Sequence, residues 1–234
     1  MHVHVAFTPA DVAAAPTGVV IDVIRATSTI CQALASGYEC VLCAAEVEDA
    51  RALAGAGVTL GGERLGVRID GFDLGNSPRE YLEPRTPTLA MSTTNGTRAI
   101  VVAAERCERV LIASLMNLGA VTAAVAAHGD DVAIFCAGVK GQPALDDTYV
   151  AGRIVGLLDG DRSDAAETAA RLAASYPTAE EAFRASRSGR NLINHGPELE
   201  ADISWCARES ALDVVPRLRS LDGVVAELGL AKTA

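Results

Sequence analysis

The sequence predicts an α/β protein with a three-layer α/β/α architecture, a largely parallel or mixed sheet and a helical C-terminal region. Two observations lead to this class. Short β-branched and apolar runs alternate with helical stretches through the first two thirds of the chain, which is the pattern of strand-helix units in a layered domain. Residues 160–234 are instead rich in Ala, Arg, Glu and Ser at helical spacing. We therefore expect residues 1–160 to form an α/β core and residues 161–234 a helical flank packed on it, within one structural domain.

Each element of the core is expected from its own pattern. Strands are expected where short apolar runs occur, at residues 3–7, 18–22, 39–44, 58–61, 87–91, 109–113 and 131–136. Helices are expected near residues 26–36, 46–55, 97–105, 117–127 and 147–158. The last has the clearest stripe, formed by Val150, Ile154, Leu157 and Leu158. The N-terminal run is expected to pair differently from the others, because no helix separates it from the next strand.

The C-terminal region is expected to contain several short helices and no strand. Proline and glycine are the residues that interrupt helices most strongly. The expected breaks are at Pro177, Gly189, Pro197 and Pro216. Trp205, the single tryptophan, is expected to pack in the core.

The composition excludes several classes of function. With 234 residues, 50% of them hydrophobic, the chain can bury a substantial core. Its 20 Lys and Arg against 30 Asp and Glu give a net charge of −10, so it lacks the basic surface that nucleic-acid binding requires. The N-terminus has no signal-peptide pattern and no apolar run is long enough to cross a bilayer. We expect a cytoplasmic protein without membrane contacts. Any anion that it binds is expected to be held by nearby cationic side chains, a metal ion or helix N-termini.

Polar residues follow the expected strands at the edge where open α/β sheets bind ligands. The strand at 18–22 runs into Asp22 and Arg25, ahead of a hydroxyl-rich helix start. The strand at 58–61 runs into Glu63, a hard oxygen donor, and Arg64. These side chains also have simple structural explanations, as helix-dipole partners or an exposed ion pair.

The segment 71–81, Gly-Phe-Asp-Leu-Gly-Asn-Ser-Pro-Arg-Glu-Tyr, has neither strand alternation nor a helical stripe. Glycine, Asn and Ser in close order describe a shaped loop. Such a loop inside a compact domain often binds or catalyses something. We expect Asp73, Asn76 and Ser77 to contact a ligand.

Two further strand ends carry similar chemistry. Small hydroxyl residues and a glycine at 93–97 precede a helix, where outward N–H groups can cradle an anion. The strand at 131–136 leads to Gly138 and then to Asp146 and Asp147, the oxygen ligands that Mg²⁺ selects. Together the four strand ends predict one acidic, Mg²⁺-binding pocket with arginines and N–H groups for an anionic substrate.

Several known site types do not fit. The 93–97 segment matches neither a Walker A motif nor Gly-x-Gly-x-x-Gly. Gln142 stands where a cysteine phosphatase whose nucleophile was Cys136 would need an arginine, and Ile24 interrupts the Asp-x-Asp of aspartyl-phosphate phosphatases. The four histidines show no metal-ligand spacing. Cys40 and Cys43 lie three residues apart on an expected strand, so they point to opposite faces and cannot hold one metal.

Several motifs in register resemble the 2-phosphosulfolactate phosphatase family. They are Asp-Val-Ile-Arg-Ala-Thr-Ser-Thr at 22–29, Gly-Glu-Arg at 62–64, the loop from residue 71, Thr-Thr-Asn-Gly-Thr-Arg at 93–98 and Cys-Ala-Gly at 136–138. Ser-Gly-Arg at 188–190 is similar to the family's C-terminal region. The resemblance implies an α/β/α fold and a Mg²⁺-dependent phosphatase that converts 2-phosphosulfolactate to 3-sulfolactate and phosphate in coenzyme M biosynthesis. The acidic pair is Asp-Asp here, where the family is associated with Glu-Asp.

The pattern and the resemblance assign expected roles. The catalytic residues are expected to be Asp22, Arg25, Glu63 and Arg64. The Mg²⁺ ligands are expected to be Asp146, Asp147 and Glu63, with Asp73 as an alternative. The substrate, a small anionic phosphorylated acid, is expected to contact Asp73, Asn76, Ser77, Thr93, Thr94, Asn95, Gly96, Thr97 and Gly138. Asp22 could act as a general base, a metal ligand or a covalent nucleophile.

Two other functions stay open at this stage. A non-catalytic binding protein for an organic phosphate or sulfonate would keep the anion cradle without needing the acidic cluster. A Mg²⁺-dependent lyase acting on a phosphorylated acid would need both the anion cradle and the acidic cluster. Either assembly state, monomer or homo-oligomer, is compatible with the sequence.

Overall fold

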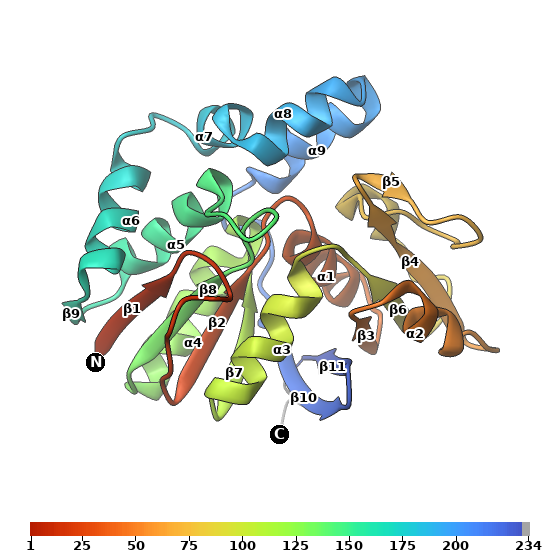
Figure 1. The fold of residues 1–234 in the computed structure, drawn as a ribbon, viewed down its shortest axis with the longest axis horizontal. Helices are drawn as coiled ribbons and strands as arrows, with labels where there is room; N and C mark the ends of the chain where they lie inside the picture. The colour runs from red at the N-terminus through yellow and green to blue at the C-terminus, as the bar shows by residue number, and fades with distance from the viewer. Residues whose placement is uncertain (231–234) are drawn as a thin grey trace.

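A central β-sheet organises the protein in the computed structural model, which describes residues 1–230. The strands are β1 (His2–Ala6), β2 (Thr17–Ile21), β3 (Cys40–Ala44), β4 (Val58–Arg64), β5 (Val67–Arg68), β6 (Thr88–Ser92), β7 (Arg109–Ala113), β8 (Val132–Cys136), β9 (Asp161–Arg162), β10 (Arg217–Asp222) and β11 (Val225–Gly229). Within the described residues they form one sheet in the order β5-β4-β6-β3-β11-β10-β7-β2-β8-β1-β9. The α/β class predicted from the sequence is confirmed (Figure 1).

The helices follow the expected alternation. They are α1 (Ala26–Ala35), α2 (Val47–Ala52), α3 (Gly96–Arg106), α4 (Leu118–His128), α5 (Leu145–Leu157), α6 (Asp164–Ala174), α7 (Ala179–Ala185), α8 (Arg187–Asn194) and α9 (Pro197–Cys206), with two short 3₁₀ helices, η1 (Pro78–Tyr81) and η2 (Leu115–Asn117). In the view of Figure 1, α7, α8 and α9 lie along the upper edge of the sheet.

The sheet consists of two parallel blocks. Strand β2 pairs in parallel with β7 and β8, and β1 pairs in parallel with β8, not with β2. On the other side, β6 pairs in parallel with β3 and β4. Because parallel strands end at the same edge, the loops after β2 and β8 gather on one side of the first block.

Side chains of the strands alternate between two cores. Val19 and Ile21 of β2 belong to the cluster that packs against α4 and α5, whereas Val20 belongs to the cluster that packs against α1 and α3. All five residues of β2 are buried, as expected for a parallel strand covered on both faces. The helices therefore form a layer on each side of the sheet.

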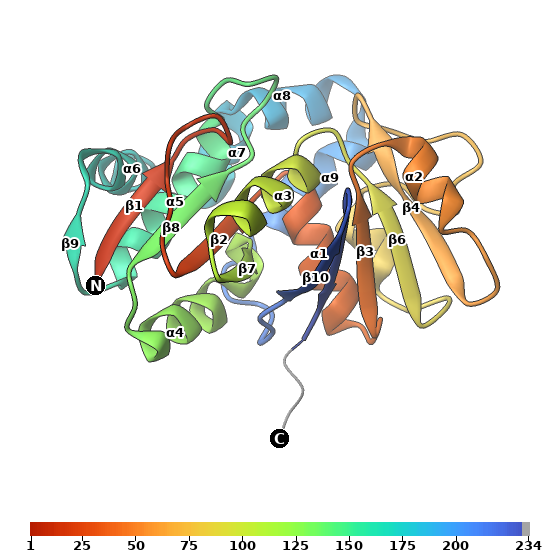
Figure 2. The same cartoon turned by 60° about the horizontal axis from the view of Figure 1, so that its bottom comes forward.

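The C-terminal prediction is partly wrong, because the end of the chain forms strands. β10 and β11 form a hairpin that joins the two blocks, with β11 antiparallel to β3 and β10 antiparallel to β7 (Figure 2). Five of the six residues of β10 are exposed, so no apolar pattern marks this strand. The turn itself had a signal: Asp222-Gly223 is a hairpin dipeptide, and Gly223 has φ +57°.

Three smaller expectations also differ from the structure. Gly189 lies inside α8 instead of ending a helix, because a side chain there would meet the carbonyl of Phe183. Trp205 is only half-buried, and its ring lies 4.1 Å from the guanidinium carbon of Arg208. Leu157, part of the expected apolar stripe of α5, is 54% exposed.

A membrane-spanning helix was not expected. Among the residues that the structure describes, no helix combines the length and the apolar character needed to cross a bilayer.

The hairpin should contribute substantially to stability. Leu228 of β11 is fully buried in the core that includes α1 and α3, so Leu228→Ala should lower the free energy of unfolding by about 2–5 kcal/mol. Val224, 48% exposed in the turn, provides the control, since Val224→Ala should change it by no more than about 0.5 kcal/mol. Urea denaturation measures both, and equal effects would contradict the packing role of the hairpin.

Candidate active site

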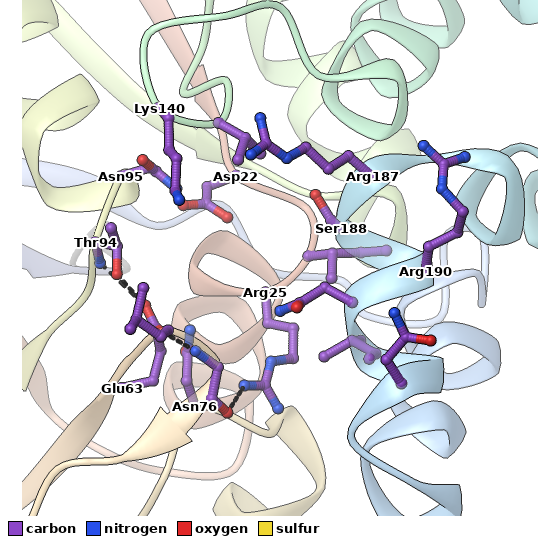
Figure 3. A pocket seen from close by; sticks show the side chains of 17 residues that line it. Asp22, Arg25, Glu63, Asn76, Thr94, Asn95, Lys140, Arg187, Ser188 and Arg190 are labelled. Carbon is purple, nitrogen blue, oxygen red and sulfur yellow. Dashed lines mark hydrogen bonds between the residues drawn. The ribbon is translucent and has the colours of Figure 1, made fainter.

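A cavity of about 390 Å³ lies where the loops after several strands meet α8 (Figure 3). Strand β2 leads to Asp22 and Arg25, β4 ends near Glu63, β6 leads to Thr94 and Asn95, and β8 leads to Lys140. The first turn of α8 adds Arg187, Ser188 and Arg190. The structure thus brings together residues from the four strand ends that the sequence singled out, and adds a helix from the C-terminal region.

Asp22 lies between the starts of two helices. Its carboxylate is 8% exposed and accepts a weak 3.4 Å hydrogen bond from the N–H of Ala26 at the start of α1. A side chain at Gly96, the first residue of α3, would lie 2.9 Å from Asp22 Oδ2 and 2.7 Å from Ala26 Cβ. Only glycine therefore allows α3 to begin so close to this carboxylate.

Glu63 connects two loops that border the cavity. Its Oε2 accepts the N–H of Gly66 at 2.6 Å, and its Oε1 accepts both the N–H and the hydroxyl of Thr94, at 3.0 and 2.8 Å. Glu63 thereby fixes the β4–β5 turn against the loop before α3. Its two oxygens already have donors within the protein.

Asp146 and Asp147 have different environments, because successive helical residues point in different directions. Asp147 accepts the N–H groups of Val23 and Gly138, each at 3.0 Å, and so holds two loops together. Asp146 is 1% exposed, and its Oδ1 has no hydrogen-bond partner among residues 1–230. A buried oxygen without a partner is costly, which marks Asp146 as the member of the pair with unmet bonding capacity.

The carboxyl groups at this site carry unbalanced negative charge. Burial raises the pKa of Asp22 to about 7, and the charges of Glu63 and Asp146 add to the effect. Burial also raises the pKa of Asp146 to about 6, although the Ser188 hydroxyl opposes it. The pKa of Asp147 is raised by burial and then by Asp146 and Asp22. A cation beside Asp22 and Asp146 would relieve this repulsion.

Arg25 is held by a carboxylate that the sequence did not indicate. Its Nη1 lies 2.8 Å from Oδ2 of Asp202 in α9, and its Nη2 donates to the carbonyl of Gly66 at 3.1 Å. Asp202 is fully buried and also accepts from the Ser77 hydroxyl at 2.6 Å and from Arg79 Nε at 2.9 Å. A single aspartate in a helix gives no signal that its partner lies 177 residues away.

Some predicted residues do not line the cavity. Arg64 follows Glu63 in β4, so it points to the other face of the strand, where it donates to Glu63 and Ala45 carbonyls and to Ser92 Oγ. Asp73 accepts the N–H of Leu60 at 2.8 Å outside the cavity. The predicted residues that lie outside the lining are Arg64, Asp73, Ser77, Thr93, Gly96, Thr97, Gly138, Asp146 and Asp147.

Other predicted residues do face the cavity. They are Asp22, Arg25, Glu63, Asn76, Thr94 and Asn95. Asn76 is 4% exposed and its Oδ1 has no partner. The lining residues absent from the sequence prediction include Lys140, Arg187 and Arg190. Only the Ser-Gly-Arg motif at 188–190 pointed toward α8, and it carried no assigned role.

The predicted metal trio is not gathered into one cluster. Within residues 1–230, no three His, Cys, Asp or Glu side chains are arranged so that they could hold a metal ion together. The reason is visible in the hydrogen bonds: Asp147 uses both oxygens for backbone N–H groups, and Glu63 uses both for Gly66 and Thr94. Asp22 and Asp146 are the carboxylates with few internal donors, and they can influence one another electrostatically.

Comparisons with known proteins agree with one another. A sequence profile of the family described as 2-phosphosulpholactate phosphatase matches residues 4–220. Proteins named probable 2-phosphosulfolactate phosphatase are similar along most of their length. The one from Thermus thermophilus is 39% identical over 211 residues, covering 87% of this chain and 88% of its own. The one from Thermotoga maritima is 38% identical over 220 residues, covering 92% and 95%.

The raised pKa values predict how stability depends on pH in metal-free protein. A carboxyl whose pKa is about 7 or 6 when folded, against 3.8 in the reference state, favours folding at low pH. That contribution is lost as the pH rises from about 4 toward 7. With a chelator present, the free energy of unfolding should therefore fall by several kcal/mol between pH 4.5 and pH 8, since each tenfold change in ionisation corresponds to about 1.4 kcal/mol. In Asp22→Asn/Asp146→Asn protein this fall should become clearly smaller, with a remainder because burial also raises the pKa of Asp147. Parallel profiles of the two proteins would refute the assignment.

The buried ion pair predicts a second stability difference. Asp202→Ala leaves the Arg25 guanidinium buried without its carboxylate and should lower the free energy of unfolding by about 3–5 kcal/mol. Asp130, whose side chain is 44% exposed in an ion pair with Arg109, is the matched control, because exposed pairs contribute at most about 1 kcal/mol. Chemical denaturation of both variants compares them, and a small effect at Asp202 would contradict its structural importance.

Proposed function

The chain belongs to the 2-phosphosulpholactate phosphatase family, whose members are phosphoric monoester hydrolases, and we propose that it hydrolyses 2-phosphosulfolactate to 3-sulfolactate and phosphate with the help of Mg²⁺. The single observation that carries the metal-dependent part is the pair of buried carboxyl groups Asp22 and Asp146 beside the cavity. Their raised pKa values and the unpartnered Oδ1 of Asp146 describe a site that lacks positive charge.

The substrate proposal rests on the relatives and on the character of the cavity. This chain covers 88% and 95% of the length of the two relatives named above. A ligand with a phosphate, a carboxylate and a sulfonate requires a small polar cavity with several donors. The cavity of about 390 Å³ has polar side chains on most sides, among them Arg25, Asn76 and Asn95.

The residues present fit a magnesium ion. Mg²⁺ takes hard oxygen ligands, usually one or two carboxylates, and completes its shell with water and substrate phosphate. Asp22 and Asp146 would provide the two carboxylates, without the three-ligand cage that the sequence suggested. When bound, the ion supplies positive charge to the phosphoryl oxygens and acidity to a coordinated water.

The other residues would orient the phosphoryl group. Arg25 is held rigidly by Asp202 and Gly66, and Asn95 precedes the N-terminus of α3. Both line the cavity, where they would donate to the phosphoryl oxygens, and fixed donors account for much of phosphoryl-transfer catalysis. In the net reaction a water oxygen bonds to phosphorus, the ester P–O bond breaks, and a proton ends on the alcohol oxygen of sulfolactate.

Phosphate release tests the activity directly. The protein should release inorganic phosphate from 2-phosphosulfolactate in the presence of Mg²⁺, lose that activity on chelation and regain it when Mg²⁺ is restored. Asp22→Asn and Asp146→Asn should each lower kcat/KM by about 100-fold or more, the scale expected when a group acting on the transition state is removed.

The control variant is Asp130→Asn, which removes one negative charge from an exposed ion pair with Arg109. It should retain wild-type turnover. Phosphate release that is unaffected by chelation would refute the metal requirement. Absence of release from a panel of 2-phospho acids would refute the phosphatase assignment for this chain.

A further inference from the structure

The basic side chains around the cavity are of two kinds. Four of them line it: Arg25, Lys140, Arg187 and Arg190. Arg25 is 5% exposed and its charge is matched by Asp202 at 2.8 Å. Among the residues that the structure describes, Lys140, Arg187 and Arg190 make no ion pair with a carboxylate. Arg190 Nη1 donates to the carbonyl of Ala185. Among the described residues, the positive charges at the cavity without a partner are therefore those of Lys140 and Arg187.

These three basic residues are more exposed to solvent than the acidic groups of the cavity. Lys140, Arg187 and Arg190 are exposed, whereas Asp22 and Glu63 are each 8% exposed. Figure 3 shows the Arg187 side chain extending from α8 toward Asp22 and Lys140, which lie across the cavity from this helix. The cavity thus has a buried acidic floor and an exposed basic rim.

Only local charge can attract an anion to this protein. The net charge of −10 gives a field that repels anions over most of the surface. Arg64, the second arginine expected at the phosphate, donates to Ser92 and two carbonyls away from the cavity. Within the cavity, the positive charge that is not already paired with a carboxylate is therefore at the rim.

We infer that Lys140 and Arg187 form a subsite for the non-reacting acid groups of the substrate, its carboxylate and sulfonate. The inference rests on the proposed function, in which the phosphoryl group lies over the acidic floor. Guanidinium groups bind carboxylate and similar oxyanions through paired, charge-assisted hydrogen bonds. The subsite selects phosphorylated organic acids over phosphate esters without an acid group, and Arg187 is its central specificity-determining residue.

Kinetics with two matched esters test this selection. Glycerol 2-phosphate is a secondary phosphate ester that lacks the carboxylate and the sulfonate. Arg187→Gln should lower kcat/KM for 2-phosphosulfolactate at least about tenfold, mainly by raising KM, because a hydrogen bond to a charged group is lost. With glycerol 2-phosphate the change should stay within about twofold. Arg187→Lys should restore part of the loss, since it keeps the charge but not the paired geometry.

Binding of 3-sulfolactate provides a readout that needs no turnover. This product has both acid groups and no phosphate, so its Kd by calorimetry reports on the rim alone. Arg187→Gln and Lys140→Gln should each raise the Kd about tenfold. Arg171→Gln is the control, because Arg171 lies on α6 outside the cavity lining with its side chain 80% exposed, and it should leave the Kd unchanged.

The outcomes separate this inference from the proposed function. Equal losses on both esters, or sulfolactate binding that is insensitive to Arg187 and Lys140, would overturn the subsite. If the wild-type protein released no phosphate but bound sulfolactate through Arg187, the phosphatase proposal would fail and the subsite would stand. Calorimetry decides the question where glycerol 2-phosphate is turned over too slowly to measure.

Discussion

The buried ion pair between Arg25 and Asp202 is the interaction on which the candidate site depends. Asp202 is fully buried and accepts from Arg25, Ser77 and Arg79, which come from the β2–α1 connection and from the loop before and within η1. A buried carboxylate tolerates only such close pairing, because an unpaired charge there costs several kcal/mol. The requirement fixes α9 over the edge of the sheet. Since α8 packs against α9, the same constraint places Arg187 beside the cavity.

The neighbouring aspartates Asp146 and Asp147 differ in how fully they are hydrogen-bonded. Asp147 is satisfied by two backbone N–H groups and serves the fold, whereas Asp146, one residue earlier, retains an unpartnered oxygen. A fold selected only for stability would not keep an unsatisfied buried carboxyl beside another with a raised pKa. Local violations of this kind are expected where a protein binds or reacts with something. The contrast within one Asp-Asp pair favours Asp146 over Asp147 as a ligand-binding residue, without reference to any relative.

The sequence predicted the parallel blocks well for a physical reason. Strands such as β2 are buried on both faces, so they appear as short apolar runs bounded by polar residues. Their ends agree with the prediction within one residue, except that β4 continues to Arg64 instead of ending at residue 61. The same reasoning failed for β10, which is mostly exposed and so has no apolar pattern. The prediction also placed Glu63 and Arg64 in one site, although successive residues of a strand point to opposite faces of the sheet. Asp202 was beyond prediction, because its role arises only from contacts between distant segments.

The separation of charge in the cavity has a consequence for how a ligand can lie in it. In the metal-free protein, Asp22, Glu63 and Asp146 would repel an oxyanion placed on the floor, while Lys140 and Arg187 would attract one at the rim. Under the proposed function, acid groups of a ligand would bind at the rim whether or not a cation occupies the floor. A phosphoryl group would reach the floor only with a cation between it and the carboxylates. Binding of the phosphoryl group would then depend on the metal ion, whereas binding of the acid groups would not. A phosphorylated acid would fit this polarity in one orientation, with its ester bond over Asp22 and its acid groups toward α8.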